Sequence, residues 1–256
     1  MRKFDFNCFC GNWPFRRIRH NTIDALIGLH SRCGIAGGLV SASEAIFYQD
    51  PYEAEQALAV ALQGTEYMHA MILNPMLPGW RDDLHRAVNT LSVKAIRLVP
   101  GYHGYRLTDT VMEAVSDALR RYKLPLIITL RIEHVWSSWM IAPRPLPEEE
   151  LQAFLERNRD IPTLLAYVLP SQLEALESQI KSRDNLFIDT AGFRSGLFPV
   201  EDSLPKAAGK IVFGSCAPFA AVQSFVNIIE YAEVSDEIRH DIYSGRKFFE
   251  SVLQWQ

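Results

Sequence analysis

The chain has 256 residues, of which 48% are hydrophobic and 22% are charged, and its formal net charge is −4. These values are typical of an ordinary globular protein. Acidic and basic residues are interleaved, without the basic stripe that nucleic-acid binding requires. No apolar run approaches the roughly 20 residues needed to span a bilayer. We therefore expect neither nucleic acid nor a membrane among the partners.

The four cysteines are too few and too scattered for a disulfide scaffold. Cys8 and Cys10 form a single C-x-C pair with no second pair nearby, so this pattern does not predict zinc. The segment Met1–Phe6 indicates the start of a strand, not a signal peptide. We expect a cytoplasmic protein with reduced thiols.

Eight short apolar segments alternate with helical segments along the chain. Most are bounded by Gly, Pro, Asn or Ser, as is typical of strands buried on both faces. The predicted strands are Lys3–Phe9, Ala36–Ala42, Met68–Asn74, Val93–Pro100, Leu126–Arg131, Thr163–Leu169, Asn185–Thr190 and Lys210–Ser215.

The clearest helix is Asp109–Lys123, which begins with an acidic residue and ends with basic ones, as the helix dipole favours. Pro147–Arg157 begins Pro-Glu-Glu-Glu, which is a strong helix start. Further helices are predicted at Ser171–Ser182, at Phe219–Glu233 and, as one or two helices, within Ser235–Leu253.

A strand followed by a helix, repeated about eight times, predicts a single-domain (β/α)8 TIM barrel over residues 1–256. The alternative is a doubly wound open sheet, which usually carries a G-x-G-x-x-G loop after its first strand. The first strand here continues into Cys10-Gly11-Asn12-Trp13-Pro14, so the barrel is favoured. The C-terminal helices would close it.

An insertion at about 132–145 is long enough to cover the mouth of the barrel. Its residues Trp136, Trp139 and Met140 could form an apolar lid over a pocket, or they could pack against a second subunit in a homodimer. Trp13 and Phe15, after the first strand, are open to the same two interpretations.

Several segments follow one another in the order found in a known family. Asp5-Phe6-Asn7-Cys8-Phe9-Cys10-Gly11 resembles an opening Asp-x-His-x-His-x-Gly, and Leu124-Pro125-Leu126-Ile127-Ile128-Thr129 resembles Leu-Pro-Val-x-x-His. Val212-Phe213-Gly214-Ser215-Cys216-Ala217-Pro218 is similar to Phe-Gly-Ser-Asp-x-Pro. The chain thus resembles the amidohydrolase-related family of TIM-barrel metal-dependent hydrolases nearly end to end.

The resemblance also implies where a metal site would lie. In that family, histidines on strands one, five and six and an Asp ending strand eight bind the metal, and the Asp transfers protons. The matching positions hold Asn7, Phe9, Thr129, Tyr167 and Cys216. Phe cannot ligate a cation, and an amide or hydroxyl does so weakly. The expectation is therefore a site without a metal or other cofactor.

Other side chains could act in place of a metal. His103 and His134 follow strands four and five, so either could serve as a general base at the mouth, or could simply bond a carbonyl. Cys216 could be a nucleophile, although an apolar filler is favoured. His30, His85 and His240 are expected on helix surfaces, and His69 is expected at the bottom of the barrel, in a stabilising role.

Arg97 and Arg131 are candidate anion-binding residues. Either arginine could pair internally with Asp189, or could hold a substrate carboxylate in a bidentate fashion. Asn7, Thr129 and Tyr167 could donate hydrogen bonds to the same ligand, or could satisfy one another.

These observations leave three hypotheses. The first is a metal-free hydrolase or lyase acting on a small anionic substrate. The second is a catalytically inactive relative that binds a small molecule or a protein. The third, least favoured, is a metal enzyme with a rearranged site built from His103, His134, Cys10 and Cys216.

Overall fold

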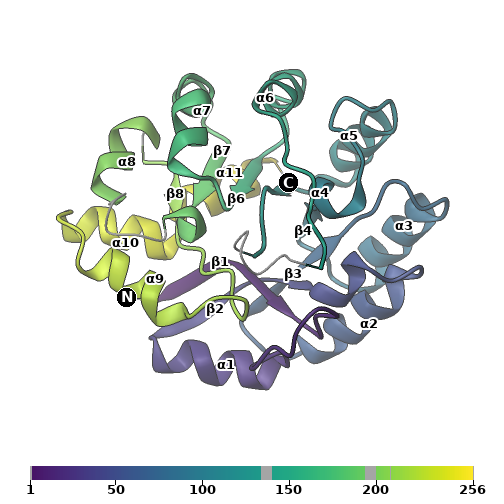
Figure 1. Ribbon diagram of the computed structural model, residues 1–256, viewed down its shortest axis with the longest axis horizontal. Helices are drawn as coiled ribbons and strands as arrows, with labels where there is room; N and C mark the ends of the chain where they lie inside the picture. Colours follow the sequence, from purple (N-terminus) through teal and green to yellow (C-terminus); the bar gives the residue numbers. More distant parts are fainter. Residues whose placement is uncertain (1, 134–139, 194–199, 208, 256) are drawn as a thin grey trace.

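The computed structural model describes the chain except for residues 1, 134–139, 194–199, 208 and 256. Eight parallel strands form one sheet in the order β1 to β8, so that each strand pairs with its neighbour in the sequence (Figure 1). The strands are β1 Lys3–Cys10, β2 Ile35–Ala42, β3 Tyr67–Ile72, β4 Ala95–Leu98, β5 Leu126–Thr129, β6 Thr163–Ala166, β7 Leu186–Asp189 and β8 Ile211–Val212.

The sheet closes on itself because β1 also meets the segment that contains and follows β8. The backbone N–H of Phe6 donates to the carbonyl of Phe213 at 2.8 Å, and Cys8 and Ala217 form a parallel bridge. The predicted (β/α)8 barrel is confirmed, and the open sheet is excluded.

Helices surround the ring of strands (Figure 1). They are α1 Ile23–Arg32, α2 Pro51–Ala61, α3 Trp80–Thr90, α4 Pro100–His103, α5 Val111–Tyr122, α6 Glu148–Arg157, α7 Pro170–Ser182, α8 Val200–Ala207, α9 Val222–Glu230, α10 Asp236–Ser244 and α11 Arg246–Trp255, with 3-10 turns at Ser43–Ile46 and Thr190–Gly192. None of the described helices combines the length and the apolar character that crossing a membrane requires.

The last helical segment divides into α10 and α11 at Gly245. This residue has φ of 56°, in the left-handed region that glycine adopts readily. A Cβ at Gly245 would lie 2.1 Å from the ring of Phe6. The sharp turn brings α11 across the N-terminal end of the barrel, where Phe248 contacts the rings of Phe6 and Phe187, each at a centroid distance of 5.4 Å.

Two buried histidines tie the strands to the surrounding helices. His30 of α1 is fully buried, with its Nδ1 2.8 Å from the hydroxyl of Tyr67 and its Nε2 3.2 Å from a carboxylate oxygen of Asp5. The prediction of a surface position for His30 is therefore wrong, because the residue lies on the buried face of its helix. His85 and His240 are exposed, as predicted.

His69 of β3 makes a polar contact with Glu55 of α2. Its Nε2 lies 2.5 Å from Glu55, whose other carboxylate oxygen accepts the backbone N–H of Ile72 at 2.9 Å. Both side chains are almost fully buried. A buried carboxylate with these partners holds the helix against the strand, which fits the stabilising role expected of His69.

Candidate functional site

A layer of polar side chains lies inside the barrel, near the C-terminal ends of the strands. Successive residues of a strand face opposite sides, so Arg97 shares the inward face of β4 with Ala95, and Thr129 shares that of β5 with Ile127. Asp189 ends β7, Ser41 lies near the end of β2, and Asn7 lies at a register shift in β1.

Arg97 occupies the centre of this layer and is fully buried. Its Nε donates to the hydroxyl of Ser41 at 2.7 Å. Its Nη1 donates to Asn7 Oδ1 at 2.9 Å and to Thr129 Oγ1 at 2.8 Å. The guanidinium also lies 4.6 Å from the centre of the Phe9 ring. Among the described residues, its Nη2 has no hydrogen-bond partner.

Asp189 is also fully buried and is held by three donors. Asn7 Nδ2 donates to Oδ2 at 2.6 Å, while the backbone N–H groups of Tyr167 and Ala191 donate to Oδ1 at 2.8 and 3.1 Å. Within the described part of the chain, no carboxylate oxygen lies within 4.0 Å of Arg97. The amide of Asn7 joins the two charges, so the direct Arg97–Asp189 pair, one of the two alternatives for this arginine, is not formed.

Burial shifts the pKa values of both charged groups. It lowers the pKa of Arg97 to about 10, so the guanidinium stays protonated at neutral pH. It raises the pKa of Asp189 to about 6, against the opposing effect of the hydrogen bonds from Tyr167, Asn7 and Ala191. Asp189 is therefore a carboxyl group that exchanges a proton close to neutral pH.

Cys216 and Tyr167 complete the set of positions aligned with lost ligands. The backbone N–H of Cys216 donates to the carbonyl of Asn7 at 2.8 Å, and its thiol donates to the carbonyl of Ile132 at 3.1 Å. Both Cys216 and Tyr167 have positive φ, of 56° and 66°, which is uncommon for residues with side chains. The structure thus brings Asn7, Thr129, Tyr167, Asp189 and Cys216 together at one end of the barrel.

The other candidates lie outside this layer. His103 ends the short helix α4, and its Nε2 lies 3.1 Å from the carbonyl of Ile46. Burial lowers its pKa to about 4, so the ring is neutral at pH 7. Arg131 is half-buried beyond the end of β5, because the strand stops at Thr129 and not at Arg131 as predicted. His134 lies outside the described residues.

Aromatic side chains cover the polar layer on the mouth side. Trp13 is 4% exposed and meets four rings edge-on, at centroid distances of 4.7 to 5.7 Å. We call this group the aromatic cover; its members are Trp13, Phe15, Phe47, Tyr102 and Phe219. Phe219 also packs on Phe9, which lies over Arg97. Of the predicted lid, Trp136 and Trp139 lie outside the described residues, and Met140 is 58% exposed.

Glu133 fastens the aromatic cover across the mouth. One carboxylate oxygen accepts the indole N–H of Trp13 at 2.9 Å, and the other accepts Nε of Arg16 at 2.6 Å. Glu133 is 4% exposed. Because Trp13 and Arg16 follow β1 and Glu133 follows β5, this contact joins loops on two sides of the barrel. Arg16, Phe47 and Ser41 were not identified from the sequence, since no local pattern marks them.

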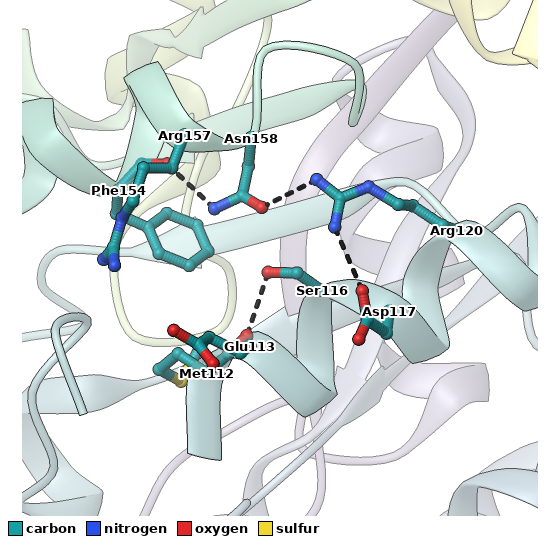
Figure 2. Close-up of a pocket in the computed structure, with 8 residues that line it drawn as sticks. All are labelled: Met112, Glu113, Ser116, Asp117, Arg120, Phe154, Arg157 and Asn158. Carbon is teal, nitrogen blue, oxygen red and sulfur yellow. Dashed lines mark hydrogen bonds and ion pairs between the residues drawn. The ribbon is translucent and has the colours of Figure 1, made fainter. Parts of the chain in front are cut away.

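The hollow in Figure 2 lies elsewhere, on the outer wall between α5 and α6. Of its two arginines, Arg120 is engaged by Asn158 and by two surface carboxylates, Asp117 and Asp160, and Arg157 donates to the carbonyl of Leu107. Ser116 donates to a carbonyl of its own helix. These contacts describe two packed helices, and they leave the barrel interior as the candidate site.

Within residues 2–133, 140–193, 200–207 and 209–255, no three His, Cys, Asp or Glu side chains are grouped so that they could hold a metal ion. Neither a family model nor a curated protein matches the sequence.

Solved structures do match the fold. A 2,6-dihydroxybenzoate decarboxylase from Rhizobium has a TM-score of 0.72 and 13% identity, covering 97% of this chain and 99% of its own. A 5-carboxyvanillate decarboxylase from Sphingomonas paucimobilis has a TM-score of 0.69 and 12% identity, covering 97% and 99%. A dihydroxybenzoic acid decarboxylase from Polaromonas, with bound manganese, has a TM-score of 0.72 and 13% identity, covering 100% and 98%. The likeness to these structures establishes the TIM-barrel fold.

Proposed function

We propose that this protein is an amidohydrolase-like barrel that works without a metal, as a hydrolase or lyase, on a small aromatic anion held by Arg97. The observation that carries the proposal is the position of Arg97, a buried guanidinium at the centre of the barrel with Nη2 unpartnered among the described residues. The substrate class is suggested by the structural neighbours, which are decarboxylases of hydroxylated benzoates and of carboxyvanillate.

The residues at the centre do not fit a divalent cation. Asn7 Oδ1 and Thr129 Oγ1 both accept hydrogen bonds from Arg97 Nη1. The carboxylate of Asp189 already accepts hydrogen bonds from three N–H donors. A dication among them would lie against a buried positive charge, and repulsion is strong where water does not screen it. The guanidinium of Arg97 therefore supplies the positive charge of the proposed site.

A carboxylate is a suitable ligand for the remaining donors of Arg97. Nη2 offers two N–H groups, and a buried donor without a partner costs roughly 1–3 kcal/mol. A carboxylate oxygen would form a short, charge-assisted hydrogen bond there. Because Arg97 is 0% exposed beneath Phe9 and the aromatic cover, the ligand can reach it only when the cover moves.

Asp189 is the residue best placed to transfer a proton. Its pKa of about 6 lies near neutral pH, where an acid or base works efficiently. Asn7 holds its Oδ2 and bonds Arg97 as well, so the proton-carrying group and the anion-binding group have a fixed relative position. His103 and Cys216 are weaker candidates, because each bonds a backbone carbonyl.

The alternative, a catalytically inactive barrel that binds a small molecule or a protein, is favoured by one specific observation. Most polar groups of the interior already have hydrogen-bond partners within the protein. Arg97 donates to three protein acceptors, and Glu133 binds Trp13 and Arg16 in the region of the cover above it. Such a network can stabilise a barrel that no longer turns over a substrate.

The test is calorimetric titration with benzoate, salicylate and 2,6-dihydroxybenzoate. We expect binding to the wild-type protein, about tenfold weaker binding to Arg97→Lys, and unchanged binding to Arg131→Lys. Circular dichroism and the melting temperature identify a variant that has not folded. Absence of binding to the wild-type protein would contradict the proposal, while binding without decarboxylation or hydrolysis in a product assay would favour the inactive relative.

A further inference from the structure

The structure has a second basic feature, on the loop that joins β1 to α1. A hollow of about 590 Å³ is lined entirely by residues of this loop, and its lining includes no acidic residue. We call it the arginine hollow; its lining residues are Asn12, Trp13, Arg16, Arg17, Ile18, Arg19, His20 and Asn21.

The loop has a defined shape, because its two ends are fastened together. The backbone N–H of Gly11 donates to the carbonyl of Asn21 at 2.7 Å, and the side-chain amide of Asn21 donates to Asn12 Oδ1 at 2.8 Å. Ile18 is buried in the core between two exposed arginines, and it anchors the middle of the loop. Compact surface loops with closed ends are often functional.

The positive charge of the hollow is only partly compensated. Arg16 is paired with Glu133, and Glu44 accepts both the backbone and the side-chain N–H of Asn12. In the part of the chain that the structure describes, neither Arg17 nor Arg19 lies within 4.0 Å of a carboxylate. Two exposed guanidinium groups therefore remain available on a preformed loop.

We infer that the arginine hollow binds a phosphate group, either as a free anion or as part of a small phosphorylated molecule. Guanidinium groups match the geometry of phosphate oxygens and bind them through paired N–H donors. Several positive groups on one small hollow favour a multiply charged anion over a single carboxylate. The fixed loop lowers the entropic cost of bringing these groups together. Its charged groups Arg17 and Arg19 differ from Arg97, which lies inside the barrel, although Trp13 belongs both to the hollow and to the aromatic cover.

The test is calorimetric titration at low ionic strength with inorganic pyrophosphate, with phenyl phosphate, and with acetate as the singly charged comparison. We expect both phosphates to bind more tightly than acetate. A higher affinity for pyrophosphate indicates a free anion, and a higher affinity for phenyl phosphate indicates a phosphorylated molecule. Arg17→Gln and Arg19→Gln should each weaken pyrophosphate binding about tenfold. Both arginines are exposed, so the melting temperature should not change.

Two further variants locate the site. Arg121→Gln removes an exposed arginine from the last turn of α5 and should leave pyrophosphate binding unchanged. Arg97→Lys should also leave it unchanged, so this inference can fail or succeed independently of the proposed function. Pyrophosphate affinity no greater than that of acetate, or equal loss of affinity in the Arg17 and Arg121 variants, would overturn the inference.

Discussion

At the scale of single residues, Asn7 holds the centre of the barrel together, because its amide bonds both Arg97 and Asp189. Strand alternation and the family-like segments brought Asn7, Thr129 and Asp189 to one end of the barrel, where the structure has them. The sequence could not reveal that Asn7 lies between Arg97 and Asp189, because that contact joins three strands. Alternation along a strand predicts on which face a side chain lies. It does not predict which side chain of a distant strand contacts it.

The pKa of Asp189 gives the proposed site a pH dependence. Below about pH 6 the carboxyl group becomes neutral, and its negative charge no longer opposes an anion near Arg97. The affinity for an aromatic carboxylate that remains ionised should therefore rise several-fold from pH 7.5 to pH 5. The measurement is titration calorimetry across this range; in Asp189→Asn, which stays neutral, the affinity should not vary with pH in this way.

Position 214 requires a glycine, because it lies against the carboxylate of Asp189. A Cβ there would lie 2.6 Å from Asp189 Oδ2, so Gly214→Ala should displace that carboxylate and destabilise the protein by about 1–3 kcal/mol. The matched control is Gly28→Ala in α1, where the nearest atom is the end of Arg32 at 3.9 Å. Urea unfolding should show a neutral or slightly stabilising effect at Gly28, and equal effects at the two glycines would contradict the assignment.

At the scale of elements, the apolar pattern predicted which segments are strands, but not where each one ends. The apolar pattern predicts that β5 continues to Arg131, whereas pairing with β6 stops at Thr129 and Ala166. Beyond that point the chain turns and places Ile132 and Glu133 in the core. Because apolar residues occur both before and after the turn, the sequence does not show where the strand ends. Helix α8 carries an internal Pro205 and was not predicted.

The contact made by Glu133 should control how easily the barrel opens. Glu133→Gln removes the charge that holds Arg16, which is partly exposed, so we expect a loss of about 1–2 kcal/mol. Release of the aromatic cover should also increase the association rate of an aromatic carboxylate in stopped-flow measurements. An unchanged rate together with the lowered stability would show that the cover does not limit access. Glu156→Gln, which alters a surface pair of α6, is the control.

Helix α11 is expected to supply a large share of the stability. Phe248 is 3% exposed and packs against Phe6 and Phe187 at the end of the barrel. Phe248→Ala should cost about 3–5 kcal/mol, because it leaves a cavity among rings. Lys247→Ala, on the exposed side of the same helix, should change the free energy of unfolding by less than about 0.5 kcal/mol. Chemical denaturation of both variants tests the comparison.

At the scale of the whole molecule, the fold could be predicted because its signal is repeated. Each strand alone is ambiguous, yet eight apolar segments alternating with helices allow few arrangements, and the order β1 to β8 is the simplest of them. No repeated sequence signal of this kind indicates the activity. It depends on a few side chains, and the same barrel carries different chemistry in different proteins.

The whole protein should purify without a stoichiometric metal at the barrel centre. The reason is the guanidinium of Arg97, which donates to Asn7 Oδ1 and Thr129 Oγ1 and places a positive charge at the centre of the barrel. Elemental analysis after purification without chelator should find well under one zinc, manganese or iron per chain. One metal per chain, lost in Asp189→Asn or Cys216→Ala but kept in the surface variant His240→Ala, would refute the metal-free site.

The seam between β1 and the last part of the chain affects how the protein folds during synthesis. The free edge of β1 is completed by Phe213 and Ala217, and the ring of Phe6 is covered by Phe248. An emerging chain must therefore keep β1 unpaired on one side until the segment from Phe213 to Phe248 has left the ribosome. Asn7 belongs to that strand and its carbonyl accepts the backbone N–H of Cys216, so the centre of the barrel is complete only once the ring has closed.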